Sequence, residues 1–119
     1  MKIGVVGAGA MGSLLGSCLA RTSNEVWLID VWREHIQEIA NNGLKVIEEG
    51  EQSIVYCNAS TSSNNIGICD LVIISTKYKD TESAIKSSLS MLGKETYVMT
   101  VQNGIGNIDI LEKYADPAY

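Results

Sequence analysis

The first twelve residues, MKIGVVGAGAMG, constrain the fold more than any other stretch of the chain. Lys2 to Val6 is short, apolar and rich in β-branched side chains, which predicts a buried strand. Met11 to Ala20 continues with apolar residues at helical intervals. The glycines between the two have the spacing G-x-G-x-x-G, and in this context of strand, turn and helix the motif indicates a dinucleotide-binding site.

Each glycine of this motif has its own expected role. Gly7 permits the tight turn out of the strand, Gly9 lets the backbone approach a pyrophosphate, and Gly12 allows the helix to pack closely on the strand. Amide groups at the start of the helix, and the positive end of its dipole, would then face the anion. The motif alone is weak evidence, because a plain tight turn uses the same glycines. The cofactor-binding residues predicted in this turn are Gly7, Ala8, Gly9, Ala10, Met11 and Gly12.

An acidic residue ends the second predicted strand, Glu25 to Asp30. Asp30 follows the glycine motif by close to the distance, about 20 residues, at which an acid binds the adenosine ribose hydroxyls of a dinucleotide. A carboxylate there repels a 2′-phosphate, which favours NADH over NADPH. Arg33 could still reach a 2′-phosphate if Asp30 turned away. The alternative is that Asp30 merely begins a turn or caps the next helix.

The rest of the chain alternates strands with helices, apart from one predicted hairpin. Such alternation predicts an α/β fold with a doubly wound, mostly parallel sheet and a small hairpin insertion. The hairpin is expected in place of a third strand and helix, and an exposed polar connection follows it. The expected segments are a helix (32–42), the hairpin (44–47 and 53–57), the connection (59–67), a buried strand (69–76), a helix (80–92), a buried strand (96–101) and a short helix (108–114).

Polar residues follow the last two predicted strands. Thr76 and Lys77 come at the end of the first, and Asn103 follows the second within the segment QNGIGN. Ligands of open α/β sheets bind at the carboxyl ends of the strands, so these residues should converge with the glycine turn on one crevice. Taken singly, Lys77 reads more simply as a solvated lysine, and Asn103 with Gly104 as a tight turn.

Length and charge narrow the possible functions. The 119 residues suit one domain, residues 1–119, and are short for a complete enzyme with two substrates. The net charge of −5 argues against nucleic acid or an anionic membrane as a partner. The start of the chain resembles neither a secretory signal nor a membrane span, so the expected compartment is the cytoplasm.

Cysteine and histidine are too sparse to indicate a metal site. Cys18, Cys57 and Cys69 form no C-x-x-C pair and are interpreted as reduced, mostly buried thiols. His35, the single histidine, lies among charged residues of the second predicted helix. It is interpreted as a solvated surface residue rather than a catalytic one.

At three segments the chain resembles the ketopantoate reductase (2-dehydropantoate 2-reductase) family: MKIGVVGAGAMGSLLG, DLVIISTKYKDTESAI and VQNGIGN. The resemblance implies a Rossmann domain, residues 1–119, that belongs to a two-domain enzyme reducing a 2-keto acid with NAD(P)H. It further implies that Lys77 and Asn103 are catalytic and face both cofactor and substrate. The general-acid lysine and the substrate-binding residues of the family lie on a helical C-terminal domain that this chain lacks. The fragment should therefore bind cofactor without appreciable turnover, and its exposed interdomain face would allow a homodimer.

One departure from the family bears on the cofactor. Classical members use NADPH and place a basic residue just after the second strand, where this chain has Asp30. In this respect the chain resembles NADH-using relatives that reduce 2-keto acids to D-2-hydroxy acids.

Other classes of protein share part of the pattern. A nucleotide-sensing Rossmann module, such as the regulatory domain of potassium transport proteins, also has a glycine turn and an acid after the second strand. The predicted hairpin and the QNGIGN segment speak against it. A methyltransferase would also place an acid on an adenosine ribose, but it has no role for QNGIGN.

Overall fold

The computed structural model describes residues 1–77 and 80–101, and these form a mostly parallel α/β fold. All pairings within its five-stranded sheet are parallel, and the strand order is β5-β2-β1-β6-β7. The predicted fold class is confirmed. The strands of this sheet are β1 (Lys2–Val6), β2 (Glu25–Ile29), β5 (Asn58–Ser60), β6 (Leu71–Ile74) and β7 (Tyr97–Thr100). The helices are α1 (Ala10–Ala20), α2 (Arg33–Asn42), α3 (Thr81–Ser87) and the short 3₁₀ helix η2 (Leu89–Met91).

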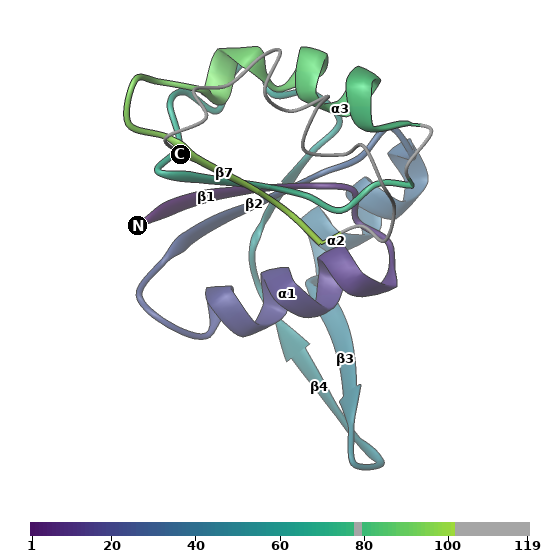
Figure 1. Cartoon of the computed structure of the whole chain (residues 1–119). Helices are drawn as coiled ribbons and strands as arrows, with labels where there is room; N and C mark the ends of the chain where they lie inside the picture. The colour runs from purple at the N-terminus through teal and green to yellow at the C-terminus, as the bar shows by residue number, and fades with distance from the viewer. Residues whose placement is uncertain (78–79, 102–119) are drawn as a thin grey trace.

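Helices cover the sheet on both faces (Figure 1). Successive residues of a strand point to opposite faces, so β1 contributes Val5 to one core and Val6 to the other. The first core joins β1 and β2 to α2 through Ile36 and Ile39. The second joins β1 and β6 to α3 and η2. The central strands β1 and β6 are buried on both faces, as their continuous apolar sequences predict.

The close approach of α1 to the sheet depends on Gly16. A Cβ atom at this position would lie 2.7 Å from Cδ2 of Leu28 in β2. The missing side chain therefore lets the helix sit directly on the strand.

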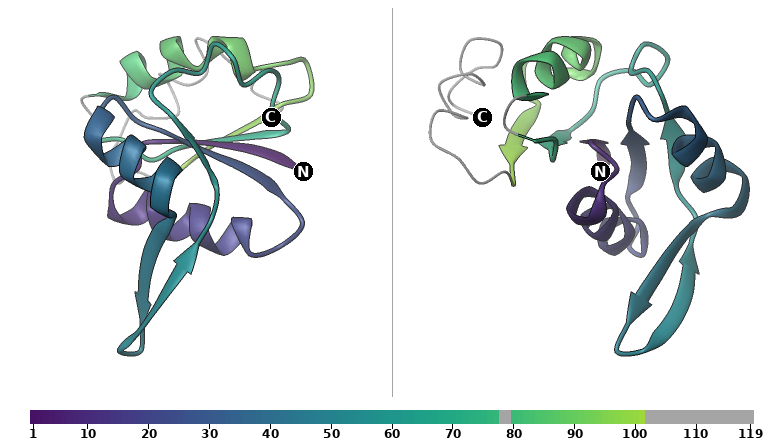
Figure 2. Two further views of the ribbon diagram at one scale, coloured as in Figure 1. Left: turned by 180° about the vertical axis from the view of Figure 1, so that it is seen from behind. Right: turned by 90° about the vertical axis from the view of Figure 1, so that its right-hand side faces the viewer.

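A hairpin of β3 (Leu44–Glu48) and β4 (Glu51–Val55) stands away from the sheet (Figure 2). Its base is anchored in the first core by Leu44, Val46 and Val55. Positive φ angles at Glu49 and Gly50, 52° and 81°, close the tip. The predicted hairpin is confirmed, although its second strand, expected over 53–57, begins and ends two residues earlier.

The sequence prediction failed to identify β5. Residues 59–67 were expected to form an exposed connection, and the hairpin to stand in place of a third strand. Instead Asn58–Ser60 pair in parallel with Trp27–Ile29 of β2. Three small or polar residues carry no hydrophobic periodicity, and the bonds to the edge of β2 are what make them a strand. The hairpin therefore precedes β5, the third strand of the parallel sheet along the chain, and does not replace it.

Two further expectations were wrong. The last described strand, β7, is not fully buried: it is the edge of the sheet among the described residues, and Tyr97 and Met99 are 53% and 45% exposed. The helix expected over 80–92 is divided into α3 and η2, because its chain turns at Ser88. Asn103 and the helix expected over 108–114 lie outside the described residues.

Candidate functional site

The glycine turn between β1 and α1 is packed against the end of β6. Gly7 has a φ of +103°, and a Cβ atom on it would lie 2.9 Å from the carbonyl oxygen of Ser75. A Cβ atom on Gly12 would lie 1.9 Å from the carbonyl oxygen of Gly7. Neither position accommodates a side chain, as the predicted turn and close packing require.

Gly9 lies in a different environment from the other two glycines. It is exposed, and a Cβ atom on it would meet no atom within 4 Å. Its φ of −73° is open to any residue, so neither the backbone conformation nor a protein neighbour requires glycine here. The open space above Gly9 is where a ligand could approach the backbone.

The start of α1 leaves backbone donors available. Gly9 is the N-cap and offers no side chain to bond the first turn, and that turn contains no acidic residue. The first hydrogen bond at this end of the helix runs from the amide of Ser13 to the carbonyl of Gly9, at 2.8 Å. The N–H groups of Ala10, Met11 and Gly12 precede it and have no carbonyl partner within the helix. Together with the helix dipole they can hold an anion.

The carboxylate of Asp30 is bonded to the glycine turn. Its Oδ2 accepts the N–H of Ala8 at 2.8 Å, and its Oδ1 accepts the N–H of Trp32 at 3.0 Å. The Asp30 N–H in turn donates to the carbonyl of Ser60, at 3.2 Å. The residue is therefore held by β5 on one side and by the glycine turn on the other.

His35 is not the solvated surface residue that the sequence indicated. It is half-buried, and its Nε2 lies 2.8 Å from the carbonyl oxygen of Ala8. That oxygen also accepts the hydroxyl of Ser13 at 2.9 Å. Since a carbonyl only accepts, His35 donates from Nε2 in this arrangement. The ring also stacks on Trp32, with centroids 4.9 Å apart and planes 25° apart.

The carboxyl end of β6 closes the other side of the site. The amide of Ser75 continues the pairing with β1 by donating to the carbonyl of Val6 at 2.8 Å. Its Oγ is buried and has no hydrogen-bond partner among the described residues. Thr76 follows against Gly7, and the exposed Lys77 comes next, where its carbonyl accepts the N–H of Asp80 at 2.8 Å.

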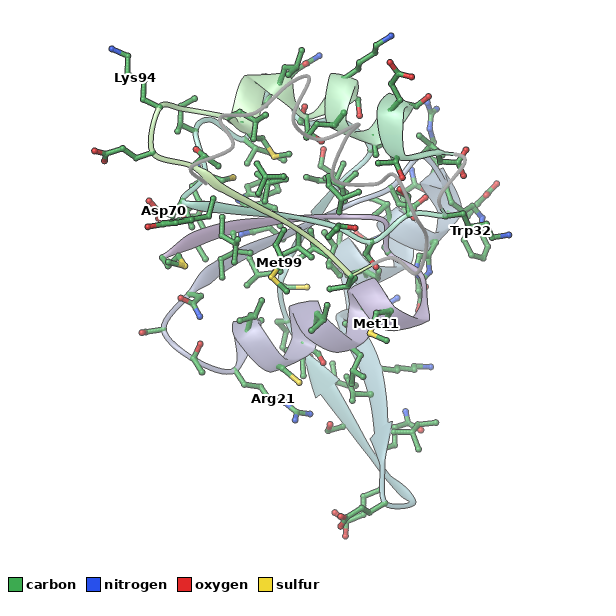
Figure 3. The ribbon with its side chains drawn as sticks, viewed as in Figure 1. Met11, Arg21, Trp32, Asp70, Lys94 and Met99 are labelled. Atoms are coloured by element: carbon green, nitrogen blue, oxygen red, sulfur yellow. The ribbon has the colours of Figure 1, made fainter. Side chains whose placement is uncertain are left out.

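The predicted site residues thus meet at one end of the sheet, where the parallel strands have their carboxyl ends, with two qualifications. Gly7 to Gly12, Asp30, Thr76 and Lys77 all lie at the carboxyl ends of β1, β2 and β6. Arg33 is exposed at the first position of α2 and borders this edge. Asn103 lies outside the described residues. Met11 and Trp32 are at this end of the molecule in Figure 3, and Asp70 is at the opposite end.

Sequence reasoning missed three residues of this edge: Trp32, His35 and Ser75. Trp32 and His35 follow Asp30 by two and five residues, and this spacing could have indicated that they lie near the site. Nothing in the sequence showed that an imidazole would turn back to the glycine loop, or that a serine hydroxyl would be buried beneath it.

The cysteines are less buried than expected. Only Cys69 is buried, Cys57 is half-buried and Cys18 is exposed; all three are free. Burial raises the pKa of the Cys57 thiol and that of the Cys69 thiol. Within residues 1–77 and 80–101, no three histidine, cysteine or acidic side chains are grouped to hold a metal ion. No helix in the same ranges is long and apolar enough to cross a membrane.

Comparison with known proteins identifies the family of this fold. The model of the family described as ketopantoate reductase PanE/ApbA matches residues 3–118. The chain belongs to the ketopantoate reductase family. Among curated members, the 2-dehydropantoate 2-reductase of Lactococcus lactis is 35% identical over 116 residues, which are 96% of this chain and 37% of that relative. The Pyrococcus horikoshii enzyme of the same name is 39% identical over 107 residues, 90% of this chain and 34% of that relative.

Solved structures of the ketopantoate reductase family and its neighbours share the fold. A PanE/ApbA family ketopantoate reductase from Ralstonia eutropha superposes with a TM-score of 0.89 at 34% identity, over 98% of this chain and 39% of its own. A D-mandelate dehydrogenase in a ternary complex with NADH and anilino(oxo)acetate superposes with a TM-score of 0.91 at 39% identity, over 98% of this chain and 38% of its own. This chain therefore spans under two fifths of the length of these relatives.

Proposed function

We propose that this chain is the cofactor-binding domain of an oxidoreductase that reduces a 2-keto acid with a nicotinamide dinucleotide. The observation that carries the proposal is the joint arrangement of the α1 N-terminus and Asp30. Uncapped amide groups suited to a pyrophosphate lie beside a carboxylate suited to a ribose, and the Ala8 amide bonds the two elements together.

The residues present fit the central pyrophosphate and the nicotinamide half of such a cofactor. The open space above Gly9 and the amides of Ala10 and Met11 would receive the pyrophosphate. Thr76 and Lys77, at the end of β6, would lie toward the nicotinamide, together with Asn103. When bound, a reduced nicotinamide supplies the hydride for the carbonyl carbon of the acid. The ammonium of Lys77 would contribute orientation and stabilise charge that develops on the carbonyl oxygen.

We further propose that the preferred cofactor is NADH. Turning Asp30 away to admit a 2′-phosphate would break its two hydrogen bonds, to the amides of Ala8 and Trp32. Hydrogen bonds to charged groups are worth about 1.5–3 kcal/mol each, so this rearrangement is costly. Arg33 is exposed nearby, yet the fixed carboxylate would repel a phosphate before the guanidinium could bind it.

The substrate class follows the family and its neighbours. We propose a 2-keto acid, either 2-dehydropantoate or one reduced to a D-2-hydroxy acid. Relatives of both kinds share this fold at 34–39% identity. The remaining length of those relatives suggests that a second domain supplies most of the substrate pocket, so the 119-residue chain should show no appreciable turnover by itself.

The test is calorimetric titration of the chain with NADH and with NADPH at one ionic strength. We expect NADH to bind at least about tenfold more tightly, equivalent to about 1.4 kcal/mol. Tighter binding of NADPH would refute the assignment of Asp30 to the ribose, and no binding of either nucleotide would refute the proposed function.

The roles of Lys77 and Asn103 require the full-length protein. There, Lys77→Ala and Asn103→Ala should each lower kcat/KM by more than about threefold, which corresponds to roughly 0.7 kcal/mol of transition-state stabilisation. Lys94→Ala provides a matched control, because this exposed lysine lies before β7, at the opposite end of the sheet (Figure 3). A change in kcat/KM no larger than that of the control would remove both residues from the catalytic site.

A further inference from the structure

Trp32 is an exposed aromatic residue at the edge that holds the candidate site. Its side chain is 60% exposed, and its backbone N–H bonds the Asp30 carboxylate at 3.0 Å. In Figure 3 it stands at the outer end of the molecule, beyond the end of β2. Tryptophan buries more apolar area than most side chains when it packs. An exposed tryptophan beside a polar site therefore indicates a surface that a ligand or partner could cover.

The indole is held in place although it is exposed. Its Nε1 donates to Oε2 of Glu34 at 3.1 Å, and its ring stacks on His35. His35 is itself bonded to the carbonyl of Ala8 in the glycine turn. A chain of contacts therefore runs from the glycine turn to the indole. A side chain ordered in advance loses less conformational entropy when a flat ligand binds to it.

The position of this ring relative to Asp30 points to a particular ligand group. Under the proposed function, on which this inference rests, Asp30 binds the ribose of the adenosine half. The adenine base is attached to that ribose, so it must lie on the same side of the site. Trp32 is two residues beyond Asp30 and shares a hydrogen bond with its carboxylate. An aromatic side chain can stack on the face of any base.

We propose that Trp32 is the stacking surface for the adenine ring of the dinucleotide. It thereby sets affinity for the adenosine half without affecting the nicotinamide half. The hydrogen bond to Glu34 and the stacking on His35 keep the indole in the orientation that the base meets. Val31, which follows Asp30, is an apolar residue that is 92% exposed, but it offers no flat face.

Trp27 provides a matched control. Its Nε1 donates to a glutamate two residues away, Glu25, at 2.9 Å, as that of Trp32 does to Glu34. Trp27 packs against the second core, however, and is the only other tryptophan in the chain. Trp27→Phe therefore leaves Trp32 as the single indole fluorophore.

The experiment measures binding of AMP, nicotinamide mononucleotide and NADH to the 119-residue chain. Trp32→Ala should lower the affinities for AMP and NADH by about five- to a hundredfold, whereas Trp32→Phe should retain most of both affinities. Affinity for nicotinamide mononucleotide should not change. In the Trp27→Phe chain, AMP should alter the remaining indole fluorescence. Thermal unfolding should be nearly the same for both Trp32 variants, since the side chain is exposed.

Two results would overturn the proposal. The first is that Trp32→Ala binds AMP and NADH with affinities within twofold of those of the original chain. If the original chain binds NADH, this result leaves the proposed function intact. The other is an indole signal that responds to protein concentration but not to AMP, which would assign Trp32 to self-association. If the original chain binds neither AMP nor NADH, the proposed function fails together with this inference.

Discussion

The Nε2 of His35 lies 2.8 Å from the carbonyl oxygen of Ala8, 27 residues earlier in the chain. This contact ties the first turn of α2 to the glycine turn before α1. Asp30 binds the amide of the same residue, so both polar groups of Ala8 are held by the segment that follows β2. The shape of the glycine turn thus depends on residues outside the glycine motif.

Removing the His35 donor should loosen the glycine turn. Net hydrogen-bond contributions are about 0.5–1.5 kcal/mol, and the Ala8 carbonyl retains Ser13 as a donor. His35→Phe should therefore lower the free energy of unfolding by about 1 kcal/mol and the affinity for NADH by ~3- to 10-fold. His35→Gln, which keeps an N–H donor, should recover part of both losses. Gln37→Ala, exposed on the same helix, is the control, and equal effects of the two histidine variants would contradict the role.

The glycines of the turn should separate folding from binding. Gly9→Ala should change the free energy of unfolding by no more than about 1 kcal/mol, because its φ is ordinary and its surroundings are open. It should nevertheless lower the affinity for NADH at least about tenfold, since the added methyl group occupies the space expected for the pyrophosphate. Gly12→Ala should destabilise the fold by about 3 kcal/mol or more, because its Cβ would overlap the Gly7 carbonyl.

Urea unfolding and calorimetry of the same preparations provide the two readouts for these glycine variants. If NADH bound Gly9→Ala as tightly as the original chain, the pyrophosphate would have to lie elsewhere.

Substitution of Asp30 tests the choice of cofactor. Asp30→Asn removes the charge and one of the two oxygens that accept the amides of Ala8 and Trp32. NADH should bind at least about tenfold more weakly. The affinity for NADPH should fall less, since its 2′-phosphate no longer meets a carboxylate. The preference for NADH over NADPH should therefore decrease.

Asp70→Asn is a matched control for the Asp30 variant. Its Oδ2 also accepts a backbone N–H, that of Lys2 at 2.7 Å, but it precedes β6 at the opposite end of the sheet (Figure 3). Nucleotide affinity should be unchanged in this variant. An unaltered NADH to NADPH ratio in Asp30→Asn would count against the ribose assignment.

The buried thiol of Cys69 should contribute to the alkaline sensitivity of the fold. Burial raises its pKa in the folded chain above the value in the unfolded chain. The contribution to stability is therefore complete below the unfolded pKa, about 8.5, and is lost as the pH rises through the folded pKa. Cys69→Ala should show a smaller fall in the free energy of unfolding between about pH 7 and about pH 9.5.

Urea titrations across this range measure that slope. Cys18→Ala, which removes an exposed cysteine, controls for the loss of a thiol as such. Parallel slopes for Cys69→Ala and the original chain would mean that the thiol does not contribute.

Much of the candidate site followed from local patterns. The strand before Gly7, the helix after it and the acid at Asp30 are recognisable because hydrophobic periodicity and glycine spacing act over a few residues. The rule that ligands bind at the carboxyl ends of parallel strands then brought Thr76 and Lys77 to the same edge. The position of Asn103 stays a prediction, because it lies outside the described residues.

By itself, the sequence determined the α/β class, the glycine turn, the hairpin and the family, since each depends on local spacing or on a linear motif. Only the tertiary structure decided that Asn58–Ser60 form a strand, that β7 is half-exposed and that His35 bonds the Ala8 carbonyl. These features depend on partners far along the chain. A hydrogen bond between residues 27 positions apart leaves no periodicity to detect, and it exists because the sheet brings the two residues together.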